Sequence, residues 1–335
     1  MTVPFAINGF GRIGRALARV AGERRELGLE LAAVNDLVPA AMLARLLARD
    51  TVHGPYEGEV AVDGEALVID GRRVPVSAAP RPDGCPWEAA GVRVVVEASG
   101  RFLARDAAAG HLRGAVERVV LSANADDADV TLCRGVNDGD YDPARHRVVS
   151  NASCTTHCMA PLARVLDDGW GLVRGVMTTV HAYTGNQTLL DAAHPEVRRT
   201  RAAAANVIPI ATSAPRAVGR LLPHLAGKLA GMSVRVPTPA AAMMELVAEL
   251  GSDADAGAVR DAFRAAATGA MAGVLAVSDE ELVSSDYVGS PYSAVVDLAL
   301  TEVVERRLAR VVAWYDNEWG YAHRLAELVS RLTPC

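Results

Sequence analysis

The first third of the chain alternates short apolar runs with amphipathic stretches. Residues 3–7, 29–34, 93–97 and 119–121 have the length and apolar character of buried strands, and residues 13–20 repeat their apolar positions at helical spacing. Strands that alternate with helices are typical of a parallel sheet. This part of the chain is therefore predicted to form a doubly wound α/β domain of the Rossmann type.

The pattern changes after Ser150. Apolar runs become longer and alternate more evenly, at residues 175–181, 232–236, 243–250 and 295–300. Such runs favour a largely antiparallel sheet with one face packed on helices. We predict a nucleotide-binding domain at 1–152 and an α+β catalytic domain at 153–315. An amphipathic helix within about 316–335 is expected to return to the first domain.

Composition narrows the class of protein. A chain of 335 residues with 50% hydrophobic residues suits two domains of roughly 150 residues each. The net charge of -6 argues against binding to nucleic acid or to an anionic membrane. No apolar run approaches the roughly 20 residues of a membrane span, and the N-terminus has no signal-peptide pattern. A cytoplasmic protein is expected.

The five cysteines do not form a structural pattern. Their number is odd, no secretory signal is present and no C-x-x-C pair occurs, so neither a disulfide framework nor a metal site is predicted. Cys154 follows a run of small polar residues and precedes a helix-forming apolar run, as expected just after a helix N-cap. A helix N-terminus favours a thiolate, which makes Cys154 a candidate nucleophile. His181 ends an apolar strand and is a candidate base.

A dinucleotide fingerprint lies between the first strand and the first helix. Gly9, Gly11 and Gly14 form a G-x-G-x-x-G motif, in which the glycines allow a tight turn, close approach of a pyrophosphate and close helix packing. Asp36 ends the second strand, where a carboxylate binds the ribose hydroxyls of NAD and repels the extra phosphate of NADP. NAD is therefore the predicted cofactor.

Several longer segments resemble one enzyme family, the phosphorylating type I glyceraldehyde-3-phosphate dehydrogenases. The resemblance runs from about residue 3 to about residue 325, and it is carried by 7–15, 150–156 (SNASCTT), 178–183, 198–204, 235–238 and 314–320 (WYDNEWG). It implies that Cys154 attacks the aldehyde, with His181 as base and as partner of a thiolate ion pair. Hydride transfer to NAD leaves a thioester, from which inorganic phosphate releases an acyl phosphate. A homotetramer is also implied.

The resemblance also assigns binding residues. It implies that Thr184 and Arg235 bind the phosphate of the aldehyde substrate. The site for the attacking phosphate is implied to comprise Ser153, Thr155, Thr212 and Ser213. The implied cofactor contacts, besides the fingerprint glycines and Asp36, are Asn8, Arg12, Ile13, Ser99, Ser122 and Asn317.

Departures from the family pattern leave alternatives open. His157 replaces a usual asparagine near Cys154, and Ser213 replaces a usual glycine. One alternative is erythrose-4-phosphate dehydrogenase, and another is an isoform resistant to a thiol-directed inhibitor. A non-catalytic binding protein is a third, disfavoured by the intact Cys154 and His181. We also hypothesise that His157 tunes the reactivity of Cys154.

Overall fold

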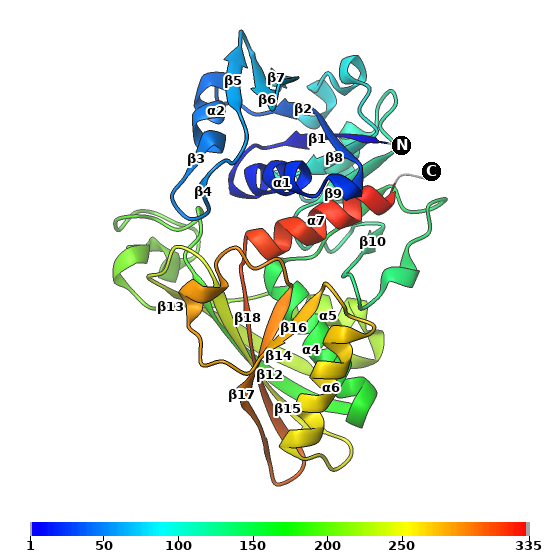
Figure 1. Cartoon of the computed structure of the whole chain (residues 1–335), viewed down its shortest axis with the longest axis vertical. Coiled ribbons are helices and arrows are strands. Elements are labelled where there is room, and N and C mark those ends of the chain that lie inside the picture. Colours follow the sequence, from blue (N-terminus) through cyan, green and yellow to red (C-terminus); the bar gives the residue numbers. More distant parts are fainter. Residues whose placement is uncertain (1, 333–335) are drawn as a thin grey trace. The chain divides into compact units, whose positions relative to one another are not determined.

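The computed structural model describes residues 2–332, which divide into two compact units (Figure 1). The first unit comprises the described residues up to Leu132, the segment Gly139–Ala152 and the described residues from Ala322 to Leu332. The second unit comprises Cys133–Asp138 and Ser153–Tyr321.

In its described residues, the first unit has a nine-stranded sheet with the order β10-β11-β9-β8-β1-β2-β7-β6-β5. Its strands are β1 (Val3–Asn8), β2 (Leu29–Asn35), β5 (Val60–Asp63), β6 (Ala66–Ile69), β7 (Arg72–Ser77), β8 (Val94–Glu97), β9 (Arg118–Leu121), β10 (Val130–Thr131) and β11 (Val148–Ser150). A small separate pair is formed by β3 (Arg49–Asp50) and β4 (Gly54–Pro55). The helices before the C-terminal one are α1 (Arg12–Glu23), α2 (Ala40–Ala48) and α3 (Arg105–Ala108).

The parallel core of this sheet follows from the sequence pattern. Strands β1, β2, β8, β9, β10 and β11 pair in parallel, which confirms the predicted Rossmann-type domain. Phe5, Ala6 and Ile7 of β1 are fully buried, because both faces of a central parallel strand are covered. Helix α1 turns Leu17 and Val20 toward the core, at helical spacing.

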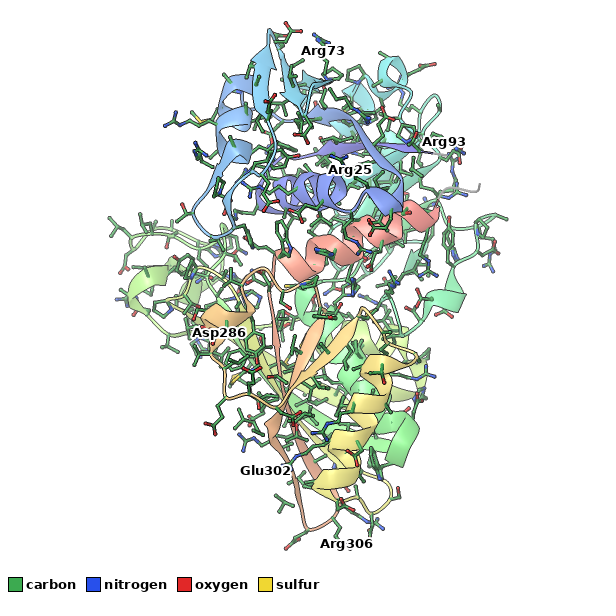
Figure 2. The ribbon with its side chains drawn as sticks, in the orientation of Figure 1. Arg25, Arg73, Arg93, Asp286, Glu302 and Arg306 are labelled. Atoms are coloured by element: carbon green, nitrogen blue, oxygen red, sulfur yellow. The ribbon has the colours of Figure 1, made fainter. Side chains whose placement is uncertain are left out.

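The three antiparallel strands at one edge of this sheet, β5 to β7, were not predicted from the sequence. Strands β5, β6 and β7 form an antiparallel meander, which joins the rest of the sheet where Val34 and Asn35 of β2 pair with β7. Asp70 and Gly71, both at positive φ, form the turn between β6 and β7. Exposed charged residues such as Arg73 interrupt the apolar alternation here (Figure 2), so the strand signal is weak.

The second unit has a seven-stranded sheet in the order β13-β14-β12-β15-β18-β17-β16. Its strands are β12 (Leu172–Ala182), β13 (Ile208–Ala211), β14 (Leu229–Val236), β15 (Ala242–Leu250), β16 (Leu275–Ser278), β17 (Ala294–Val304) and β18 (Leu308–Tyr315). Pairing is parallel between β12 and β14 and between β16 and β17, and antiparallel elsewhere. The predicted largely antiparallel sheet is confirmed.

One face of this second sheet packs on helices. These are α4 (Cys154–Trp170), α5 (Ala214–Leu221) and α6 (Ala256–Thr268). In β15 the alternate residues Met244 and Leu246 are fully buried, as the alternating pattern requires. The other face leaves Val176 and Met232 about half exposed, at 57% and 46%. Figure 2 shows the charged end of the β17–β18 hairpin at Arg306.

The C-terminal helix α7 (Trp319–Leu332) contributes most of its residues to the first unit. Leu325 and Val329 are fully buried there. Glu327, which is 4% exposed, accepts a hydrogen bond from Arg24 at 2.8 Å and one from Arg324 at 2.7 Å. These charge-assisted bonds hold the helix against the end of α1.

His323 makes the stability of the first unit depend on pH. Burial, reinforced by the charges of Arg324 and Arg24, lowers the pKa of His323 to about 4. Between this value and about 6.5, the pKa of an exposed histidine, the unfolded state binds a proton that the folded state does not. The free energy of unfolding should therefore fall as pH falls through this window, by up to about 3 kcal/mol.

Denaturant unfolding at pH 7.0, 5.5 and 4.5 measures this effect. His323→Gln should lose clearly less stability on acidification than the unmodified protein. His224→Gln is a suitable control, because the His224 side chain is 56% exposed. Equal acid sensitivity of the His323→Gln variant and the unmodified protein would exclude His323 as the source.

No helix within residues 2–332 combines the length and the apolar character required to cross a bilayer.

Candidate active site

Cys154 is the first residue of α4. Ser153 is its N-cap, and the Ser153 side chain accepts a hydrogen bond from the Thr156 amide at 3.2 Å. Ala152, fully buried, has a φ of +49°, a conformation that is strained for a residue with a side chain. The predicted N-cap is confirmed, and it places the thiol at the positive end of a helix of 17 residues.

His181 reaches the thiol from the end of β12. Its Nε2 lies 3.6 Å from Cys154 Sγ. Its Nδ1 lies 2.7 Å from the carbonyl oxygen of Ala182. In the tautomer whose Nδ1 carries the proton and donates to this carbonyl, the Nε2 lone pair is directed at the thiol, as a general base requires.

Arg235 lies beside His181 on the neighbouring strand. The two residues are paired in the register of β12 and β14. The guanidinium donates to the carbonyl of Ala182 at 2.9 Å, and the same nitrogen lies 2.6 Å from His181 Nδ1. A fixed positive charge therefore adjoins both the imidazole and the thiol.

These surroundings favour the neutral forms of both reacting groups. Burial, helped by the charge of Arg235, lowers the pKa of His181 to about 3. Burial raises the pKa of the Cys154 thiol, against the opposing effects of Arg235 and of hydrogen bonds from Thr155. Both pKa shifts favour a neutral thiol beside a neutral imidazole over the ion pair that the family resemblance implies.

The hydroxyl groups of Thr179, Tyr315 and Thr155 form a chain of contacts that ends near the thiol. The hydroxyl of Tyr315 is 2.8 Å from that of Thr179 and 3.3 Å from that of Thr155. The Tyr315 ring also meets the His181 ring edge-on, with centroids 5.9 Å apart. Sequence reasoning missed Thr179 and Tyr315, although Tyr315 lies inside the WYDNEWG motif.

The residues expected to bind phosphate lie on several elements. The hydroxyls of Ser153 and Thr155 contact Thr156 and Tyr315, respectively. Thr212 and Ser213 lie immediately before α5, which packs against α4, and the Thr212 hydroxyl accepts a hydrogen bond from the Ala214 amide. These contacts bring Thr155 next to the thiol and leave Thr212 and Ser213 on a separate segment.

A second arginine, not predicted from the sequence, joins the substrate end of the site. Thr184 donates a hydrogen bond to Asn186 at 2.6 Å, and Arg199 donates to the same amide oxygen at 3.3 Å. Arg199 is 8% exposed, and its charge contributes to lowering the pKa of Arg235. Thr184, Arg199 and Arg235 together form a positive region suited to a phosphate group.

A separate cavity of about 230 Å³ lies within the first unit, at the carboxyl ends of its strands. Among the residues predicted to bind the cofactor, its lining includes Asn8, Gly9, Gly11, Asp36 and Ser99. A side chain at Gly9 would come within 2.5 Å of the Ser99 backbone, so only glycine fits this turn. The cavity has the glycine-lined floor and terminal carboxylate that a dinucleotide requires.

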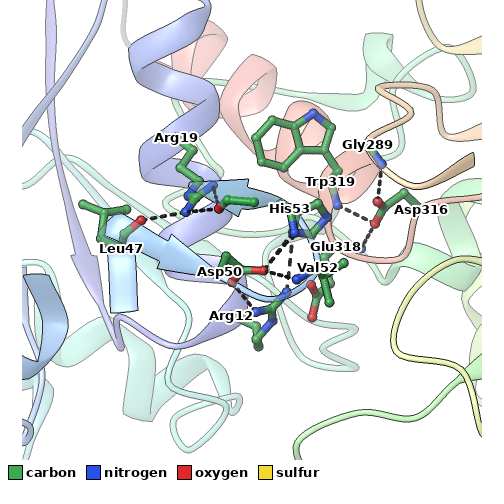
Figure 3. A network of polar contacts seen from close by, with 11 residues as sticks. Arg12, Arg19, Leu47, Asp50, Val52, His53, Gly289, Asp316, Glu318 and Trp319 are labelled. Atoms are coloured by element: carbon green, nitrogen blue, oxygen red, sulfur yellow. Dashed lines mark hydrogen bonds and ion pairs between the residues drawn. The ribbon is translucent and has the colours of Figure 1, made fainter. Parts of the chain in front are cut away.

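The other predicted cofactor residues of the first unit are not among those that line this cavity. A side chain at Gly14 would meet the Gly9 carbonyl at 2.4 Å, so Gly14 lets α1 pack closely. Ile13 is in the same turn of α1, and Ser122 donates to the Glu97 carbonyl at 3.0 Å. Figure 3 shows Arg12 paired with Asp50.

Glu97 organises the floor of the cavity and was also missed from the sequence. Its buried carboxylate accepts hydrogen bonds from the Asn8 side chain at 2.5 Å and from the Ser99 amide at 2.8 Å. His111 Nε2 lies 3.1 Å from the same carboxylate, and Trp87 donates to His111 Nδ1 at 3.0 Å. Two cavity-lining residues are thus fixed by one buried carboxylate.

Asn317 lies in the second unit just before α7. It is 5% exposed, and its side-chain oxygen has no hydrogen-bond partner among the described residues. The adjacent Asp316 accepts hydrogen bonds from the amides of Gly289, Glu318 and Trp319, each at 2.8 Å (Figure 3). A rigid turn therefore presents an unsatisfied amide oxygen, which fits recognition of a carboxamide group.

The imidazole of His157 contacts Cys133 and Tyr321. His157 is 1% exposed, its Nδ1 lies 3.3 Å from Cys133 Sγ, and its ring meets that of Tyr321 edge-on at 5.8 Å. These contacts tie the first turn of α4 to two other segments of the second unit. They favour a packing role over the tuning of Cys154.

His157→Asn should therefore lower the free energy of unfolding by about 1–2 kcal/mol. The rate of Cys154 alkylation as a function of pH should stay within about twofold of that of the unmodified protein. Cys133→Ala is the matched variant, since it removes the other partner of the same contact. A large shift of the alkylation profile in His157→Asn alone would support the tuning hypothesis instead.

Comparisons with known proteins agree over both units. The family model described as the NAD binding domain of glyceraldehyde 3-phosphate dehydrogenase matches residues 3–105, and that of the C-terminal domain matches residues 153–317. A glyceraldehyde-3-phosphate dehydrogenase of Kitasatospora aureofaciens is 51% identical over 327 residues, covering 98% of each chain. Those of Geobacillus stearothermophilus and Bacillus subtilis (its enzyme 1) are each 48% identical, again with 98% of each chain covered.

Proposed function

The chain belongs to the glyceraldehyde-3-phosphate dehydrogenase family and is an NAD-dependent oxidoreductase that oxidises glyceraldehyde 3-phosphate, and we propose that Cys154 and His181 perform this oxidation. The observation that carries the assignment is the distance of 3.6 Å between Cys154 Sγ and His181 Nε2. Cys154 is the nucleophile and His181 the general base.

The neutral resting pair sets the order of proton movements. As Cys154 Sγ attacks the aldehyde carbon, the thiol proton passes to His181 Nε2, and a hemithioacetal forms. Protonated His181 then donates its proton to the former carbonyl oxygen, and the neutral imidazole takes that proton back when the hydride leaves the carbon. Arg235 favours each state in which sulfur or oxygen carries negative charge.

NAD supplies the acceptor for the hydride that leaves the hemithioacetal carbon. The residues that fit its binding in the first unit are Asn8, the fingerprint glycines, Asp36 and Ser99. The family resemblance implies Asn317, whose amide oxygen has no partner among the described residues, as the residue that orients the carboxamide. Asp36 accepts hydrogen bonds from the amides of Phe10 and Val38, at 2.7 and 3.0 Å, which fixes its carboxylate. A fixed carboxylate selects ribose hydroxyls over a phosphate, so NAD should support much faster turnover than NADP.

Loss of the hydride leaves a thioester on Cys154, which conserves the energy of oxidation. Inorganic phosphate then attacks the thioester carbon, the bond to sulfur breaks, and 1,3-bisphosphoglycerate is released. We assign the phosphate of the aldehyde substrate to Thr184 and Arg235, with Arg199 as an additional cation. Ser153, Thr155, Thr212 and Ser213 are assigned to the attacking phosphate.

The similar proteins named above favour glyceraldehyde 3-phosphate over erythrose 4-phosphate as substrate. They do not favour a specialised inhibitor-resistant isoform. Steady-state production of NADH from each aldehyde, with and without inorganic phosphate, tests the assignment. We expect glyceraldehyde 3-phosphate to be preferred, with multiple turnovers only when phosphate is present. Sustained turnover without phosphate would overturn the phosphorolysis step.

We further propose a homotetramer in the cytoplasm. The segment from Ala182 to Ile208 exposes large apolar side chains, with Leu189 at 79%, Leu190 at 76% and Val197 at 81%. Side chains of this size are rarely left in water over so short a stretch, which favours a second copy of the chain as their cover. Sedimentation should give a mass about four times 35.2 kDa, and a monomer at micromolar concentration would exclude the assembly.

A further inference from the structure

A chain of hydrogen-bonding groups leads from β12 to the candidate nucleophile. The Thr179 and Tyr315 hydroxyls lie 2.8 Å apart, and the Tyr315 and Thr155 hydroxyls lie 3.3 Å apart. The Thr155 hydroxyl is 3.9 Å from Cys154 Sγ, within reach of a hydrogen bond to sulfur. The succession Thr179, Tyr315, Thr155 thus ends at the reacting atom.

The fold places these groups by strand register. Ala242 of β15 pairs with His181 of β12 on one side and with Tyr315 of β18 on the other. Because Ala242 has only a methyl group, the Tyr315 ring can lie across it and reach the residues of β12. Thr179 is fully buried, Tyr315 is 1% exposed and Thr155 is 7% exposed, so water does not compete for these hydrogen bonds.

We propose that this hydroxyl relay donates toward Cys154 Sγ, which makes Thr179 and Tyr315 positioning residues for the thiolate that forms during attack. The inference rests on the assignment of Cys154 as nucleophile. A hydroxyl donates one hydrogen bond and accepts others. When sulfur is negative, Thr155 donates to it, Tyr315 donates to Thr155, and Thr179 donates to Tyr315.

This orientation supplies hydrogen-bond donors to the partly buried thiol. Burial disfavours the thiolate, so the groups that face it decide how readily it forms. The groups around the sulfur that titrate or carry charge are His181, Arg235, Cys158 and Tyr315. Arg235 supplies charge, while the relay supplies donors whose strength increases cooperatively along a chain. Burial keeps the pKa of Tyr315 well above its usual value, so it remains a donor.

Tyr315 has a second contact that couples the relay to the base. Its ring meets the His181 ring edge-on, at an interplanar angle of 76°. The same residue therefore constrains the imidazole plane and the donor to Thr155. A change at Tyr315 that spares the ring but removes the hydroxyl separates the two effects.

The test uses Tyr315→Phe and Thr179→Val in the full-length enzyme, with Tyr287→Phe as control. Tyr287 is buried in the same unit, at 4% exposure, and stacks on Trp314. The readout is the rate of Cys154 alkylation by iodoacetamide as a function of pH, together with kcat and KM. Tyr315→Phe should slow alkylation at pH 7 about tenfold, by raising the pKa of the thiol, and should lower kcat more than it raises KM.

Thr179→Val should give a smaller change in the same direction, and the double variant should add little to Tyr315→Phe. At the end of the relay, Thr155→Ser should keep the alkylation rate of the unmodified protein at each pH. Thr155→Val, which has no hydroxyl, should slow alkylation in the same direction as Tyr315→Phe. Superimposable profiles for Tyr315→Phe and the unmodified protein would overturn the relay, as would an equal shift in Tyr287→Phe. Failure of the proposed function is distinguishable, because it would appear as turnover that survives in Cys154→Ser.

Discussion

Replacement of Cys154 by serine is expected to lower kcat for glyceraldehyde 3-phosphate at least about 10⁴-fold, the scale seen when an enzyme loses its nucleophile. A serine hydroxyl at the start of α4 can occupy the same volume, so the fold should persist. The hydroxyl is far less acidic than a thiol and is a weaker nucleophile beside the imidazole of His181, and an ester would not conserve the energy of oxidation as a thioester does. Steady-state NADH formation measures the loss, and calorimetric binding of NAD shows that the cofactor site is intact.

Cys158→Ser is the matched control for this experiment. Cys158 lies one helical turn further along α4 and is fully buried, and burial raises its pKa well above the usual value. It should alkylate slowly and should not be needed for turnover. A Cys154→Ser enzyme with more than about one per cent of the original kcat would refute covalent catalysis at this residue.

Replacement of His181 by asparagine should lower kcat by about 10²–10⁴-fold, the range for loss of a general base. Asparagine can still accept a hydrogen bond but cannot carry the thiol proton. Because the pKa of His181 is lowered to about 3, its base form is present throughout the neutral range. The rate of acylation in the unmodified enzyme should therefore rise with pH along the titration of Cys154, with no inflection near 6.5 from His181.

Single-turnover acylation between pH 5 and pH 9 gives this profile. His224→Asn is the control, since His224 pairs with Asp167 at 2.6 Å on the exposed surface. An inflection near pH 6.5 that disappears in His181→Asn would show that the imidazole titrates normally in the working enzyme. A loss of less than tenfold in kcat would assign the base role to another group.

The parts of the fold that local sequence determines were predicted. Strand β1, the glycine turn and helix α1 are specified by apolar spacing and by positions that only glycine can occupy, such as Gly9. The N-cap before Cys154 is specified within a few residues in the same way. The meander β5–β7 was not predicted, because it lies at a sheet edge where charged residues replace the apolar alternation.

The contacts that set the chemistry are between distant residues, and local patterns do not contain them. Thr155 and Tyr315 are separated by 160 positions, and Asn8 and Glu97 by 89. Their meeting depends on strand order and register, which the apolar pattern leaves undetermined. The neutral state of His181 likewise follows from burial beside Arg235, and composition gives no indication of it.

The position of helix α7 determines the order in which the two units can complete their folding during translation. The first unit contains the earliest part of the chain and also the last, and the buried Leu325 and Val329 come from the end. A ribosome adding roughly 5–20 residues per second needs on the order of 10–30 s to proceed from Ala152 to Ala322. Throughout that time the nascent nucleotide-binding fold lacks its final helix, whereas the catalytic fold has all of its residues at the end of the interval. A premature stop codon just before Trp319 would therefore damage the domain that was translated first.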